Sequence, residues 1–206
     1  MNITFFNFKG GVGKTSLAAA YALSRKSGFV TNDLSRLDHI GFEYFTQLDA
    51  NRKRIPAELL HEENTVYDMG AMSGAIDPKV IDALKHSEVV VIPTLTDMNS
   101  IRATIESIQE AKQYVDVVIV VINRVRKRDR KYDTAMEQLQ AVLPASHILM
   151  MKETTLFYRL AADGATLFEN VGHEKGLGQL IRTYREMMGL FDTVEALAIK
   201  GTRIYG

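Results

Sequence analysis

The sequence predicts a single α/β domain, in which helices cover both faces of a mostly parallel, twisted β-sheet. Short apolar runs alternate along the chain with segments of helical period, which is the pattern of repeated strand–helix–strand crossovers. Runs such as VDVVIVVIN are apolar at almost every position, as is typical of parallel strands buried on both sides. The 206 residues suit one such domain over 1–206, and we expect about 192–206 to form a C-terminal tail.

The individual elements follow from these two patterns. Apolar runs predict strands at 2–8, 28–33, 64–69, 88–94, 115–123 and 146–151. Helical period predicts helices at 14–26, 76–86, 98–114, 131–142, 155–163 and 175–190. Residues 34–63 are charge-mixed and poorly periodic, and we expect short helices there, lying over a strand edge.

Composition excludes several classes of function. The chain has 25 basic and 25 acidic residues, so a surface that attracts nucleic acid must be a local one. It has no cysteine, which excludes disulfides, thiolate metal sites, iron–sulfur clusters and a cysteine nucleophile, and fits a reducing cytosol. The first residues, MNITFFNFKG, lack the basic start of a signal peptide, and no apolar run approaches the roughly 18 residues of a membrane span. We therefore expect a cytoplasmic protein.

A glycine-rich loop follows the first predicted strand. In NFKGGVGKTS, residues 7–16, three glycines allow the main-chain amides to surround a phosphate group at the start of the next helix. We expect Lys14 to contact the β- and γ-phosphates and the Thr15 hydroxyl to bind Mg²⁺. This context predicts an ATP/ADP and Mg²⁺ site formed by Gly10, Gly11, Val12, Gly13, Lys14, Thr15 and Ser16.

The loop departs from the usual G-x-x-x-x-G-K-[ST] motif, because Phe8 occupies the first glycine position. KGGVGKT instead resembles the deviant Walker A loop of the ParA/MinD ATPase family, within the P-loop NTPase fold, and the chain looks most similar to small plasmid-partition ParA proteins. In that family an added lysine begins the loop, and Lys9 occupies its place. The resemblance implies that Lys9 reaches the phosphates held by a second subunit, so that bound ATP joins a homodimer, and that Lys9 and Lys14 are both catalytic.

Further segments extend the resemblance. NTVYDMGAMSG is similar to a family segment in which a strand ends in a metal-binding aspartate, here Asp68. The turn that follows in the family, here 70–74, senses the γ-phosphate. The alternative for Asp68 is an ordinary helix cap. VVINR places Asn123 at a strand end, where relatives contact adenine, although asparagine there is also a common turn former. Residues 151–169 resemble the loop and helix that pack beside the base.

The strand after the loop helix departs from the family pattern. The family ends this strand in D-x-D, and here Asp33 fills the first place, near the metal, while Ser35 fills the second. A serine can hold a water but cannot take its proton, so we expect hydrolysis to be slow or absent. Asp38 could substitute if the loop folds differently. The resemblance thus implies a metal site of Thr15, Asp33 and Asp68, with Asp33 also catalytic.

The basic segment NRVRKRDRKYD, residues 123–133, is a second candidate site. ParA relatives bind DNA phosphates without sequence preference through such surface cations, and dimerisation doubles the contacts. A solvated loop before a helix is an equal alternative, and the first arginine could instead lie beside the nucleotide. The candidate DNA-binding residues are Arg124, Arg126, Lys127, Arg128, Arg130 and Lys131.

The sequence favours a ParA-like, Mg-ATP-dependent ATPase for plasmid or chromosome partition. The resemblance implies a nucleoid-associated ATP dimer on non-specific DNA, released when a centromere-binding, ParB-like partner stimulates hydrolysis. The C-terminal stripe lacks a lysine-rich polar side, so no membrane contact is expected. An ATP-binding switch with little or no hydrolysis is the alternative that Ser35 favours, and a P-loop kinase or ligase acting on a small metabolite is a third.

Overall fold

The sheet contains seven strands in the part of the chain that the computed structural model describes, which is residues 1–33, 40–70, 76–157, 159 and 178–204. The strand order is β3-β2-β4-β1-β5-β6-β7, and each of these pairings is parallel. The strands are β1 (Ile3–Phe6), β2 (Gly28–Thr31), β3 (Phe45–Gln47), β4 (Thr65–Met69), β5 (Val89–Thr94), β6 (Val118–Val125) and β7 (Ile148–Lys152).

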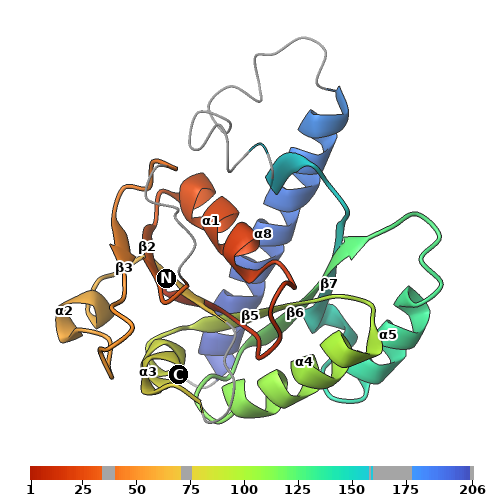
Figure 1. Ribbon diagram of the computed structural model, residues 1–206. Helices are drawn as coiled ribbons and strands as arrows, with labels where there is room; N and C mark the ends of the chain where they lie inside the picture. Colours follow the sequence, from red (N-terminus) through yellow and green to blue (C-terminus); the bar gives the residue numbers. More distant parts are fainter. Residues whose placement is uncertain (34–39, 71–75, 158, 160–177, 205–206) are drawn as a thin grey trace.

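Helices cover both faces of this sheet, as the sequence predicted (Figure 1). The helices α1 and α8 pack on one face, and α3, α4 and α5 pack on the other. The helices are α1 (Lys14–Arg25), α2 (Ala57–Leu60), α3 (Pro78–Lys85), α4 (Met98–Ala111), α5 (Tyr132–Gln140) and α8 (Gly178–Ile204), with a 3₁₀ turn, η1, at Ala145–His147.

The central strand β1 contributes to both cores. Ile3 and Phe5 pack with α1 and α8, whereas Phe6 packs in the core on the opposite face. Both faces are therefore apolar, which is why the buried strands read as continuous apolar runs. The strands β2, β3 and β4 lie on one side of β1, and the later strands β5, β6 and β7 lie on the other. The strand order therefore reverses at β1. In parallel α/β sheets such a point leaves a crevice at the carboxyl ends of the strands, where ligands bind.

The edge strand β3 corrects the expectation for 34–63, where the sequence indicated short helices but no strand. Phe45–Gln47 pair in parallel with β2 over three positions. A strand of three residues is too short to show a periodic pattern in the sequence, and its position depends on tertiary packing. The ring of Phe45 stacks with those of Phe29 and Phe42, with centroids 6.1 and 5.8 Å away.

The C-terminal helix α8 is also longer than predicted, since it continues past residue 190 to Ile204 instead of giving way to a tail. The charges in this segment concealed its apolar spacing. Glu195, for example, faces the protein and forms an ion pair with Arg25 of α1 at 2.6 Å. The buried residues that extend the apolar face are Phe191, Val194 and Ala198.

Two further expectations concern the helix at 155–163 and the lack of a membrane span. The helix predicted at 155–163 falls mostly outside the described residues. Among the residues that are described, no helix has the length and apolar character that crossing a membrane requires.

Replacing Phe191 by alanine should lower the free energy of unfolding by about 3–5 kcal/mol, because it leaves a cavity in the core under α8. The Phe191 ring meets the ring of Tyr21 edge-on, with centroids 5.1 Å apart. Ile199 lies on the same helix but is 52% exposed, so Ile199→Ala is a matched control that should change stability by less than about 0.5 kcal/mol. Urea denaturation measures both variants, and equal losses would contradict the packing of α8.

Candidate functional site

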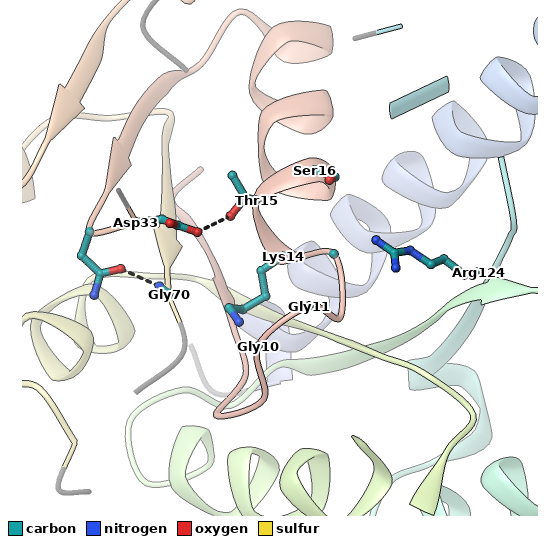
Figure 2. A pocket seen from close by; sticks show the side chains of 10 residues that line it. Gly10, Gly11, Lys14, Thr15, Ser16, Asp33, Gly70 and Arg124 are labelled. Atoms are coloured by element: carbon teal, nitrogen blue, oxygen red, sulfur yellow. Dashed lines mark hydrogen bonds between the residues drawn. The ribbon is translucent and has the colours of Figure 1, made fainter. Parts of the chain in front are cut away.

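A cavity of about 540 Å³ lies at the carboxyl ends of the strands, beside the loop that joins β1 to α1 (Figure 2). The loop forms one wall of the cavity, and residues at the ends of β2, β4 and β6 form the rest of its lining. The lining residues are Gly10, Gly11, Gly13, Lys14, Thr15, Ser16, Asn32, Asp33, Gly70 and Arg124. Most of the predicted nucleotide-binding residues therefore share one cavity with Asp33.

Two glycines of the loop adopt conformations that other residues avoid. Gly11 has φ +77° and Gly13 has φ +95°. A Cβ atom on Gly13 would lie 2.3 Å from Nδ2 of Asn123, which donates to the main-chain oxygen of Val12 at 3.0 Å. Gly13 is also the N-cap of α1 and supplies no side-chain cap. The first amides of the helix are thus available to an anion in the cavity.

Lys14 is only 5% exposed and lies against its own loop. Its Nζ donates a hydrogen bond to the main-chain oxygen of Lys9 at 2.9 Å. Burial lowers the pKa of Lys14, whereas the negative charges of Asp68 and Asp33 raise it. A buried ammonium group gains from any anion that enters the cavity, so this arrangement suits a phosphate ligand.

Oxygen donors gather at the ends of β2 and β4. Thr15 Oγ1 donates to Asp33 Oδ2 at 3.0 Å (Figure 2), and Thr31 Oγ1 donates to Asp68 Oδ2 at 3.0 Å. Asp68 is fully buried, and this burial raises its pKa to about 6, although the Thr31 hydroxyl and the Lys14 charge act in the opposite direction. Its second oxygen, Oδ1, has no hydrogen-bond partner in the described part of the chain.

These groups fit a hydrated Mg²⁺ ion. Mg²⁺ prefers oxygen ligands and keeps several waters, so its sites need only a few protein groups. Thr15, Asp33 and Asp68 supply a hydroxyl and two carboxylates, and a metal-bound water would satisfy the unpartnered Asp68 Oδ1. The described residues contain no group of three or more His, Cys, Asp or Glu side chains placed to hold a metal by themselves.

Four residues predicted for the site do not line the cavity. Val12 and Asp68 are buried, Lys9 is exposed, and Asn123 is 2% exposed beneath the loop. The Asn123 amide is already engaged, since Nδ2 donates to Val12 and Oδ1 accepts the Arg124 amide at 2.9 Å. This placement makes Asn123 a support of the loop, and its contact with adenine stays a prediction.

Sequence reasoning missed Asn32, which lines the cavity at the end of β2. Its Oδ1 accepts the Gly70 amide at 2.5 Å and so ties β2 to the start of the turn after β4. The available signal was a polar residue at the carboxyl end of a buried strand, next to the predicted aspartate. Ser35, Asp38 and 71–74 lie outside the described residues, so the roles expected of them stay predictions.

The basic segment is divided between two environments. Arg124 lines the cavity, and Figure 2 shows it across the loop from Asp33. The alternative that it lies beside the nucleotide stays a prediction. Arg126 forms a two-pronged ion pair with Glu153, at 2.9 and 3.0 Å. The other four cations, which are exposed, are Lys127, Arg128, Arg130 and Lys131. A DNA contact would therefore rest chiefly on these four.

Comparison with known families agrees with this geometry. The CobQ/CobB/MinD/ParA nucleotide binding domain matches residues 3–167, which is most of the chain. None of the curated protein sequences matches.

Solved structures of low sequence identity share the fold. The Mg-ADP complex of the septum site-determining protein MinD from Pyrococcus horikoshii is 14% identical, covers 95% of this chain and 97% of its own, and has a TM-score of 0.63. A Cyanothece McdA–ATP complex is 13% identical, with coverage of 94% and 96% and a TM-score of 0.63. A plasmid partition protein from Borrelia burgdorferi bound to AMPPNP is 15% identical, with coverage of 92% and 97% and a TM-score of 0.56.

Alanine at Gly13 should cost more stability than alanine at Gly11. Both substitutions force a side chain into a left-handed conformation, which costs about 1–2 kcal/mol. Only Gly13→Ala also displaces Asn123, whereas the space around Gly11 is open to 4 Å. Thermal unfolding of the two variants measures the difference in stability. The double variant Gly13→Ala/Asn123→Ala should recover part of the extra loss, because the collision is removed. Equal losses would contradict the support that Asn123 gives to the loop.

Asp68→Asn should stabilise the protein near pH 7.5 in the absence of Mg²⁺ and nucleotide. The folded state holds a proton on Asp68 up to about pH 6, but the unfolded state only to about 3.8, so stability falls as pH rises between these values. A shift of this size corresponds to up to about 3 kcal/mol. Denaturation between pH 4 and 8 measures the slope, with Asp116→Asn, at an exposed site, as control. An unchanged slope in Asp68→Asn would contradict the prediction.

Proposed function

Because the chain belongs to the CobQ/CobB/MinD/ParA nucleotide binding domain family, we propose that it is a ParA-type, Mg-ATP-dependent ATPase that dimerises on ATP and partitions plasmid or chromosomal DNA. The observation that carries this proposal is the different placement of the two lysines of one loop. Lys14 is buried at the cavity, whereas Lys9 is exposed and does not line the cavity of its own subunit. Lys9 is therefore available to phosphates that another subunit holds.

Each buried charge at the cavity has a role in this proposal. Lys14 and the first amides of α1 bind the phosphates, while Thr15, Asp33 and Asp68 hold Mg²⁺, directly or through water. When bound, Mg²⁺ neutralises phosphate charge and fixes the geometry of the triphosphate. Burial lowers the pKa of Lys14 and raises that of Asp68, so each of these groups is stabilised when an opposite charge arrives.

The same electrostatics accounts for two lysines so close together. Lys9 and Lys14 place two like charges in one short loop, and the Lys14 ammonium contacts the main-chain oxygen of Lys9. Their repulsion is offset when a triphosphate, with its several negative charges, is shared between subunits. Bound ATP then acts as the link of a homodimer, and loss of the γ-phosphate weakens that link.

The cellular role rests on the neighbours and on the basic segment. The Borrelia burgdorferi neighbour is a plasmid partition protein, and the Pyrococcus horikoshii MinD is a septum site-determining protein. The exposed cations Lys127, Arg128, Arg130 and Lys131 favour partition, because they suit non-specific contact with DNA phosphates. In this proposal the dimer is cytoplasmic and nucleoid-associated, and a ParB-like partner stimulates its slow hydrolysis.

An ATP-dependent switch is the second candidate function. It is favoured by Ser35, which provides no carboxylate where the family has its second aspartate. Turnover measured with Mg-ATP, with and without duplex DNA and a centromere-binding partner, separates the two. Stimulated turnover supports the partition ATPase, whereas a stable ATP dimer with no turnover under any condition supports the switch.

Lys9→Ala should bind ATP as the wild type does but should not dimerise on ATP. The reason is that Lys9 lies outside the cavity of its own subunit. Lys14→Ala should instead weaken nucleotide binding itself, by roughly tenfold or more, since it removes a charge-assisted contact. Sedimentation velocity with ATP, ADP and a non-hydrolysable analogue measures dimerisation, and a fluorescent ATP analogue measures affinity.

Lys53→Ala removes an exposed lysine elsewhere on the surface and is the control for both measurements. A Lys9→Ala protein that still dimerises on ATP would overturn the role given to Lys9.

A further inference from the structure

The side chain of Asn7 lies at the junction between β1 and the phosphate-binding loop and is fully buried. Its Nδ2 donates to the main-chain oxygen of Pro93 at 2.8 Å and to Oγ1 of Thr104 at 2.9 Å. Its Oδ1 accepts the main-chain amide of Lys9 at 2.8 Å. Both amide hydrogens are thus used, and the oxygen faces the loop, so the carboxamide has a single satisfied orientation.

Helix α4 makes a second connection to the loop, through Ser107, which is also fully buried. The Ser107 hydroxyl donates to the main-chain oxygen of Ala103 at 2.7 Å and accepts the amide of Phe8 at 3.0 Å. Phe8 stands where the usual motif has glycine, and its ring packs edge-on against Phe6 with centroids 5.0 Å apart. Two successive amides, those of residues 8 and 9, are therefore fixed by polar groups on or tied to α4.

We propose that Asn7, Thr104 and Ser107 are positioning residues for Lys9, and that α4 thereby sets the direction in which its side chain leaves the loop. This inference rests on the proposed function, in which Lys9 contacts the nucleotide of a second subunit. The Lys9 side chain has four flexible methylene groups, and only its attachment to the main chain can be fixed in advance. Fixing that attachment before two subunits meet lowers the cost of ordering the lysine during dimerisation.

The connection acts directly on the main chain of Lys9, whereas Lys14 is joined to that main chain only through its side-chain amine. Lys14 begins α1, and its Nζ reaches the main-chain oxygen of Lys9 from within the cavity. Removing the hydroxyl groups of Thr104 and Ser107 should therefore disturb dimerisation while leaving the subunit's own phosphate contacts in place. A purely structural role would affect nucleotide binding and dimerisation together.

The test uses Thr104→Val and Ser107→Ala, which remove one hydroxyl each with little change of shape. With a non-hydrolysable ATP analogue, each variant should raise the dimer dissociation constant by about 3- to 10-fold, the cost of ordering one long side chain that is no longer fixed in advance. The affinity of the dilute monomer for a fluorescent ATP analogue should change by less than about threefold. Thr104→Ser, which keeps the hydroxyl, should dimerise within about threefold of the wild type.

Ser87→Ala is the matched control. The Ser87 hydroxyl donates to the main-chain oxygen of Ala83 at 2.9 Å, the same contact four residues back that Ser107 makes to Ala103, but it does not touch the loop. It should leave dimerisation unchanged. Thermal unfolding of every variant identifies any that fail to fold, and Thr104→Ser then decides the outcome, since a loss of dimerisation as large as that of Thr104→Val would contradict positioning by the hydroxyl.

Lys9→Ala in the same assay separates the two ideas. If Lys9→Ala dimerises like the wild type, the proposed function is wrong. If Lys9→Ala stays monomeric while Thr104→Val and Ser107→Ala dimerise like the wild type, the function stands and the positioning role is overturned. Equal losses of nucleotide affinity and dimerisation in these two variants would also overturn it.

Discussion

The phosphate-binding loop keeps its shape because two buried asparagines bond to its main chain from opposite ends. Asn7 holds the amide of Lys9 at the start of the loop, and Asn123 holds the oxygen of Val12 near its end. Neither bond lies within a helix or strand ladder, and both bring side chains of the sheet to a segment that has no regular structure of its own. Beside this support Gly13 is left-handed, and its lack of a Cβ atom leaves room for Asn123.

The site holds two buried charges of opposite sign that the fold compensates only in part. Lys14 and Asp68 are both buried, and burial opposes the charged form of each. Packing elsewhere in the two cores offsets this cost, as is common where a local arrangement serves a ligand instead of stability. In the proposed function, nucleotide, metal and partner subunit would add stability at the same place, and one loop would couple binding to assembly.

Local patterns in the sequence were sufficient for most of the fold and for the loop. Continuous apolar runs indicated parallel strands, and the glycines with Lys14 and Thr15 indicated a phosphate site, because those properties depend on neighbours in sequence. The edge strand β3 and the second half of α8 could not be predicted this way. Their positions depend on contacts with distant residues, such as the stacking of Phe45 on Phe29 and the ion pair of Glu195 with Arg25.

The sequence by itself determined the order of most strands and helices, the type of phosphate loop and the family resemblance that includes Lys9. Only the tertiary structure decided what surrounds each polar group. It placed Asn123 under the loop, Asn32 against Gly70, Arg124 in the cavity and Arg126 on Glu153. The reason is physical: hydrogen-bond partners and burial are set by which strand ends meet at the edge of the sheet, and spacing along the chain does not contain that information.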